Sequence, residues 1–214
     1  MRSAGLRLLQ IYSALAKSKQ HLLDSLLVDH LPQQWEHYPS DDAIDTTSGY
    51  QWFYHSHSPE DRPLGAEHGH IHLFARRSLW SRRLKSRAEA EFEKICATHK
   101  TETQTRHLLG IGLSAKGIPI SLFTINSWVT GDLMLSSKLT MQLLATIRLN
   151  TGHTIIDSVI ETVIQLCLND IHSLMTQRDI TLASYPGTNV LGNEKLELLS
   201  ALPINLDAKL NALL

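Results

Sequence analysis

Histidines gather in one short stretch of the chain. Five of the twelve lie within eighteen residues, as His55-Ser-His57 and then His68-Gly-His70-Ile-His72. Alternate side chains of an extended strand share a face, so we expect each group to line one face of a strand. Neutral imidazole is a common metal ligand and changes its charge near neutral pH. The stretch therefore predicts metal binding or proton-transfer chemistry.

Strand spacing limits which histidines can share one ion. Three alternate residues span about 13 Å along a strand, so the outer two cannot easily meet at one ion. A neighbouring strand lies only about 4.8 Å away, which lets a histidine of the first group complete a three-nitrogen site with the second. The sequence therefore predicts a divalent ion, iron or zinc, held by nitrogens from these candidate ligands: His55, His57, His68, His70 and His72.

Glu67 stands beside the second group and is expected, together with His70, to carry catalysis. A carboxylate with two histidines is a ligand set typical of non-haem iron. Strict alternation places Glu67 on the face opposite His68, so the strand must bend for the carboxylate to join the site. The alternative left open is a hydrogen-bonded polar face of the sheet that binds no metal.

Three further residues are expected next to the site. His107 begins a later strand and is a reserve ligand or a hydrogen-bond partner of a ligand. Asn126 and Trp128 end another strand and share its parity, so both side chains can reach one cavity. The alternative for these two is a strand that turns into a helix, with Trp128 filling space in the core.

The second histidine group resembles the histidine-triad motif, in which histidines alternate with apolar residues. That family hydrolyses or transfers nucleotides, and the resemblance implies that His70 attacks an α-phosphate. It covers the seven residues from His68 to Phe74, and Gly69 stands where the family has an apolar residue. A nucleotide hydrolase or transferase is thus one alternative to a metal-dependent hydrolase or oxygenase. A metal-binding module without catalysis is the other.

Hydrophobic periodicity predicts an α+β fold around these histidines. Strands are expected at 50–57, 67–75, 107–114 and 119–126. Their short links favour one antiparallel sheet of about four strands. Helices from the N-terminal and C-terminal parts of the chain are expected to pack this sheet, at 3–30, 86–98, 137–149 and 153–177, with a weaker helix at 193–201.

The hydrophobic periodicity is weakest near the end of the chain and at 35–49, where an irregular segment is expected. We expect a single domain over 1–214, with a core at about 5–180 and a C-terminal tail at 181–214.

Composition restricts the class of protein. The 20 Lys and Arg residues nearly balance 21 Asp and Glu residues, for a formal net charge of −1, which argues against a general nucleic-acid binder. One basic run at 76–87 can meet phosphate or anionic lipid, although a solvated helix or loop is the expectation. Cys96 and Cys167 form no CxxC pair, so a thiolate zinc site is not expected.

No membrane partner is expected, because no run of eighteen apolar residues occurs. The N-terminal residues lack a clean apolar leader pattern, so a cytoplasmic location is expected. The remaining partner is a small-molecule substrate, whose identity the sequence does not specify.

Four blocks of sequence together resemble a bacterial family described only as a domain of unknown function. They are Trp35-Glu-His-Tyr-Pro39, Tyr54-His-Ser-His57, Glu67-His-Gly-His-Ile-His-Leu-Phe74 and Asn126-Ser-Trp-Val-Thr-Gly131. The resemblance runs from about residue 5 to 205, and the Glu-His-Gly-His block is its most specific part. It implies a compact domain and no particular activity.

Overall fold

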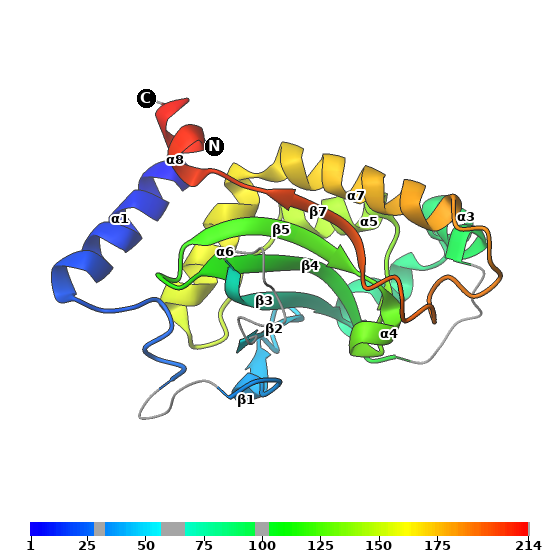
Figure 1. Cartoon of the computed structure of the whole chain (residues 1–214), viewed down its shortest axis with the longest axis horizontal. Coiled ribbons are helices and arrows are strands. Elements are labelled where there is room, and N and C mark those ends of the chain that lie inside the picture. Colours follow the sequence, from blue (N-terminus) through cyan, green and yellow to red (C-terminus); the bar gives the residue numbers. More distant parts are fainter. Residues whose placement is uncertain (28–32, 57–66, 97–102, 214) are drawn as a thin grey trace.

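The computed structural model describes residues 1–27, 33–56, 67–96 and 103–213. One β-sheet crosses the molecule, and helices cover one of its faces (Figure 1). The α+β class expected from the sequence is therefore confirmed. Within the described ranges, no helix is both long and apolar enough to cross a membrane.

The sheet contains seven strands within the described residues, in the order β1-β2-β3-β4-β5-β7, with β6 paired to β4 off this path. The strands are β1 (Tyr38–Ile44), β2 (Tyr50–Ser56), β3 (Glu67–Arg76), β4 (Thr105–Ser114), β5 (Pro119–Ile125), β6 (Leu133–Met134) and β7 (Leu198–Pro203). Neighbours along the path pair antiparallel, whereas β6 runs parallel to β4. The strands β2 to β5 match the four expected ones, so the expected number of about four was too low.

The three additional strands lack a recognisable strand pattern. β1 contains Pro39 and two adjacent acids, a composition that suits an edge strand, where fewer backbone donors are needed and charge discourages further pairing. β7 pairs with β5, so the helix expected at 193–201 was wrong. β6 has only two residues, too few to show any periodicity.

The helices are α1 (Arg2–Ser18), α2 (Arg77–Trp80), the 3-10 helix η1 (Ser81–Arg83), α3 (Arg87–Cys96), α4 (Ser127–Thr130), α5 (Ser137–Ala145), α6 (Thr154–Leu166), α7 (Leu168–Ala183) and α8 (Leu206–Asn211). The first expected helix, at 3–30, is too long, because α1 ends at Ser18 and the next residue, Lys19, has a left-handed φ of 56°. The helix expected at 153–177 is interrupted at Cys167, where ψ of 19° turns the chain between α6 and α7. α6 is largely apolar, and α7 presents an apolar face with Ile171, Leu174 and Met175, so core-facing apolar residues recur on both sides of this break.

Alternation along β2 and β3 decides which side chains meet the helices. Trp52 and Tyr54 of β2 and Ile71 and Leu73 of β3 belong to the main apolar core, together with α6 residues such as Ile160. The residues between them point to the other face of the sheet. That second face carries the histidines.

A buried carboxylate ties α6 to the sheet. Asp157 is 3% exposed and accepts a hydrogen bond from Nε1 of Trp52 at 2.9 Å. It also accepts hydrogen bonds from the backbone N–H and the hydroxyl of Thr151, both at 2.8 Å. This carboxylate therefore fixes both the indole of β2 and the loop before α6.

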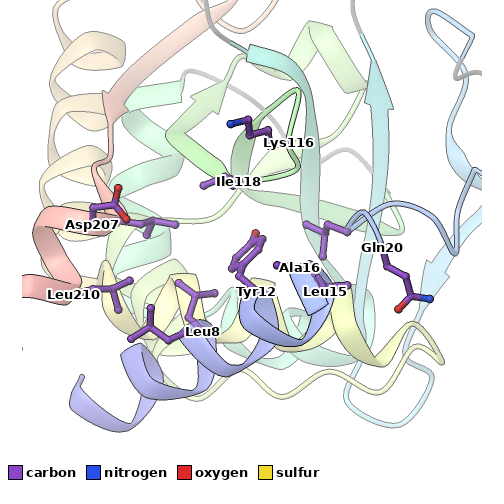
Figure 2. A pocket seen from close by; sticks show the side chains of 12 residues that line it. Leu8, Tyr12, Leu15, Ala16, Gln20, Lys116, Ile118, Asp207 and Leu210 are labelled. Atoms are coloured by element: carbon purple, nitrogen blue, oxygen red, sulfur yellow. The ribbon is translucent and has the colours of Figure 1, made fainter. Parts of the chain in front are cut away.

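An apolar pocket of about 330 Å³ lies away from the histidines, between α1, α8 and the turn that joins β4 to β5. Figure 2 shows Leu8 and Tyr12 of α1 facing Ile118 and Leu210 across it. The hydroxyl of Tyr12 donates to the carbonyl of Gly117 at 2.8 Å, which anchors α1 to the turn.

We expect Asp157→Ala to lower the free energy of unfolding by about 2–5 kcal/mol, because three donors, the buried indole of Trp52 and the N–H and hydroxyl of Thr151, lose their acceptor. Urea denaturation followed by tryptophan fluorescence and circular dichroism measures this change. The matched control is Asp41→Ala, an exposed acid of β1, which should change stability by no more than about 0.5 kcal/mol. Equal losses in the two variants would contradict the assigned role of Asp157.

Candidate metal centre

Three histidines converge on the face of the sheet opposite the helices. His55 of β2 is paired with His70 of β3 across the strands, and His72 follows on the same face of β3. One ligand nitrogen from each lies within 4.8 Å of the others. His70 and His72 are each only 2% exposed, and His55 is partly exposed. The pairing of two strands is thus sufficient to bring the three imidazoles together.

The carboxylate of Glu67 is a hydrogen-bond partner of His70. Its Oε1 lies 2.7 Å from Nδ1 of His70, and its Oε2 accepts a hydrogen bond from the hydroxyl of Ser121 at 3.0 Å. A carboxylate can only accept, so Nδ1 of His70 carries the proton of this bond. In the neutral ring, the lone pair is then on Nε2, which faces Nε2 of His55 at 2.5 Å.

A β-bulge places Glu67 on this face. Glu67 is aligned with Ser114 of β4 and Gly69 with Leu113, so β3 has one more residue than β4 at this point. The extra residue reverses the alternation, which brings the Glu67 carboxylate to the side of His70. The side chain of His68 is exposed and lies outside the three-histidine group. The bend that the sequence required for Glu67 is therefore present as a bulge.

A second bulge, in β4, places His107 beside His72. Leu73 is aligned with Leu109 and Phe74 with His107, so Leu108 is the extra residue. Nε2 of His107 lies 3.1 Å from Nδ1 of His72. The remaining ring nitrogen of His72 is therefore the one available to the cluster.

Burial keeps these two imidazoles neutral. It lowers the pKa of His72 well below the usual value of 6.5, and the proximity of His70 lowers it further, because two adjacent imidazoles cannot both easily carry a proton. Burial also lowers the pKa of His107 to about 3, with a smaller contribution from His70. Each ring therefore keeps a lone pair at neutral pH, as a metal ligand or a hydrogen-bond acceptor requires.

Two glycines of β4 make room for the cluster. Gly110 lies between His72 and Phe123 in the sheet, and a Cβ added there would collide with the ring of Phe123. Gly112 is aligned with His70, and a Cβ there would collide with the Glu67 carboxylate. Larger residues at these positions are therefore incompatible with the present arrangement.

A pocket of about 450 Å³ opens beside the cluster. Its lining includes His55 and His72 and the aromatic rings of Phe53 and Phe74. The other lining residues come from β1, β2, β4, α4 and the segments beside them: Trp35, His37, Asp42, Gln51, Thr105, Val129, Thr130 and Asp132. The described lining therefore contains two carboxylates and neither lysine nor arginine.

The two carboxylates of this pocket have defined partners. Oδ1 of Asp42 lies 3.1 Å from Nδ1 of His37, whose ring stacks on Phe53 with 3.6 Å between centroids. Asp132 accepts a hydrogen bond from the hydroxyl of Thr105, and burial raises the pKa of Asp132. Only a weak signal for these residues is present in the sequence, since His37 and Asp42 belong to a segment that reads as irregular and polar.

Asn126 and Trp128 were expected at the site, but they are not part of the pocket lining. His57 falls outside the described residues. Asn126 is fully buried, but its side chain caps α4 by accepting from the N–H of Ser127 and donates to the carbonyl of Val190. Trp128 donates to the carbonyl of Leu196. These two residues therefore shape the turn from β5 into α4, and neither is among the residues lining the pocket.

Comparison with known proteins identifies the family. A family model described as a domain of unknown function (DUF6969) matches residues 2–204, so the chain belongs to this family. This match confirms the resemblance to an uncharacterised domain and its approximate extent. No curated protein and no solved structure matches the chain.

The contact between Gly110 and Phe123 can be tested by a double-mutant cycle. Gly110→Ala should lower the free energy of unfolding by about 1–3 kcal/mol, because the new methyl group overpacks the sheet against the Phe123 ring. Phe123→Leu removes the ring, so the double variant should lose less stability than the sum of the two single losses. Additive losses, measured by urea denaturation, would show that this ring does not require a glycine opposite it.

Proposed function

We propose that this member of an uncharacterised family binds one divalent metal ion through His55, His70 and His72. The observation that carries the proposal is the convergence of three imidazole nitrogens within 4.8 Å on adjacent strands. Zinc sites with three protein ligands commonly leave a further position for water or substrate. The pocket beside His55 and His72 supplies space for such a position.

The surroundings of the ligands fit a metal. Ligating histidines usually hold their second nitrogen in a hydrogen bond, often to a carboxylate. Glu67 provides this bond for His70, and His107 provides it for His72. Partners of this kind orient the ligating nitrogens toward a metal. They therefore support a metal site over the alternative of a polar sheet face that binds no metal.

The position of Glu67 favours a three-histidine set over the two-histidine, one-carboxylate set of iron oxygenases. Its two oxygens are engaged by Nδ1 of His70 and by the hydroxyl of Ser121. The carboxylate therefore acts on the metal through His70. Zinc is thus preferred over iron.

Hydrolysis is the reaction class that suits this site best. When bound, such an ion lowers the pKa of a coordinated water to about 7 and supplies a hydroxide nucleophile. The pocket, at about 450 Å³, is within the range of small-molecule sites. Its acidic lining favours a neutral or cationic substrate over an anionic one.

Nucleotide transfer by His70 has less support. A phosphate substrate requires positive groups, whereas the described lining has Asp42 and Asp132 and no lysine or arginine. His70 is not among the lining residues, and its Nε2 faces His55. A nucleophile needs access to substrate, so this arrangement fits a ligand better.

Protein purified without a histidine tag should contain, or take up, one zinc ion per chain. His55→Ala and His72→Ala should each abolish stoichiometric binding, because two remaining nitrogens do not hold the ion. Elemental analysis and calorimetric titration with zinc measure this. The matched control is His68→Ala on the same strand, whose exposed side chain lies outside the group.

Two results would overturn the metal proposal: tag-free protein that neither contains nor binds a divalent ion, or a His68→Ala variant that loses as much binding as His72→Ala. Cobalt substitution separates a catalytic site from a closed one. If a coordination position is open, added azide should change the visible spectrum of the cobalt protein. An unchanged spectrum would favour a metal-binding module without catalysis.

Glu67→Gln should retain the ion but weaken its affinity by about 10–100-fold, because the orienting partner of His70 loses its charge. Competition with a chromophoric chelator gives the affinity. The control is Asp41→Asn, which changes an exposed acid of β1. This variant should bind zinc with the affinity of the unmodified protein. Unchanged affinity in Glu67→Gln would mean that the carboxylate does not act through His70.

A further inference from the structure

We propose that a second pocket, among the helices, binds a small soluble polyanion that carries two or more phosphate groups. This cavity of about 470 Å³ lies between η1, α3 and α5. Four cationic side chains line it: Arg82, Arg83, Arg87 and Lys138. It shares no lining residue with the histidine pocket, so the proposal is independent of the metal.

The charge around this pocket departs from that of the chain as a whole. Basic and acidic residues nearly balance over the chain, at 20 and 21. Residues 76–87, in contrast, include six Lys and Arg residues and no acid. The fold adds Lys138 of α5, which is distant in sequence, and the described lining contains no carboxylate. A concave surface with one sign of charge concentrates counter-ions.

The cationic groups are available to a ligand. Arg82, Arg83 and Lys138 are exposed. Arg87 forms an ion pair with Glu91 one helical turn away, at 2.8 Å, and both side chains are largely exposed. Such a surface pair contributes little to stability, so a multiply charged anion can displace the glutamate from Arg87.

Two helix ends add to the positive potential. Ser86, Arg87 and Ala88 at the start of α3 and Lys138 and Leu139 in the first turn of α5 line the same cavity. Helix N-termini carry a partial positive charge and favour anions. The side-chain charges and the helix dipoles act in the same direction, while Glu89, the acid in the first turn of α3, is buried and accepts from the N–H of Ser136 rather than lining the cavity.

The chemistry of the lining selects phosphate in a small molecule. Guanidinium groups bind phosphate oxygens through paired, charge-assisted hydrogen bonds, and three of the four cations are arginines. The volume suits a ligand that enters a cavity. A membrane surface or a nucleic-acid duplex is too broad to fill this concavity, so we assign the site to a soluble polyphosphate.

Calorimetric titration with inorganic tripolyphosphate tests the proposal. The titration is done at about 0.15 M salt, where interactions between exposed charges more than about 8 Å apart are largely screened. We expect saturable binding of one molecule per chain. Arg83→Gln/Lys138→Gln should weaken it by about tenfold or more, because two charged contacts are lost. The control is Lys94→Gln/Lys195→Gln, which changes the net charge equally at exposed positions outside the pocket and should bind as the unmodified protein does.

Four outcomes would overturn the proposal. The first is an absence of tripolyphosphate binding, and the second is equal weakening in both double variants. The third is loss of binding in His72→Ala, which would place the polyphosphate at the metal. The fourth is a Lys138-dependent interaction with phosphatidylserine vesicles or duplex DNA that is tighter than that with tripolyphosphate. Circular dichroism of each variant confirms that it is folded.

Discussion

The antiparallel pairing of β2 with β3 sets the positions of the three candidate ligands. His55 lies opposite His70, while Trp52, Tyr54, Ile71 and Leu73 point to the helices. A slip of one residue would turn the histidines into the apolar core and expose the indole. The burial that stabilises the helical face therefore also holds the imidazoles in register, and the site needs no separate scaffold.

Two departures from regular pairing complete the centre. Strict alternation would leave Glu67 and His107 on the face turned away from the cluster, and one extra residue in each strand reverses this. Both bulges place a hydrogen-bond partner beside a buried imidazole nitrogen, Glu67 beside Nδ1 of His70 and His107 beside Nδ1 of His72. An unsatisfied buried polar atom costs about 1–3 kcal/mol, so these bulges stabilise the fold as well as orient His70 and His72.

Much of this arrangement could be predicted from the sequence, and the failures have physical reasons. The central strands and the shared histidine face follow from period-two alternation, which reports side-chain direction reliably in regular strands. The β1 and β7 strands were missed because a strand at the sheet edge is selected less by apolar pattern than by its one partner. The break at Cys167 was missed because apolar residues that face the core recur on both sides of it, in α6 and in α7. Asn126 and Trp128 share parity with the strand but follow its end, where the chain turns into α4 and alternation no longer applies.

A net charge near zero conceals a separation of charge within the fold. The pocket beside the histidines has Asp42 and Asp132 in its lining, whereas the pocket among the helices has four cations and no carboxylate. A bound divalent ion would offset the acids of the first pocket, whereas the cations of the second are offset only in part, by the exposed pair of Arg87 with Glu91. Separated potentials of opposite sign attract different ligands to the two places. An anion drawn to α3 and α5 would therefore not compete for the acidic pocket, and a cationic or neutral substrate would not be drawn to the arginines.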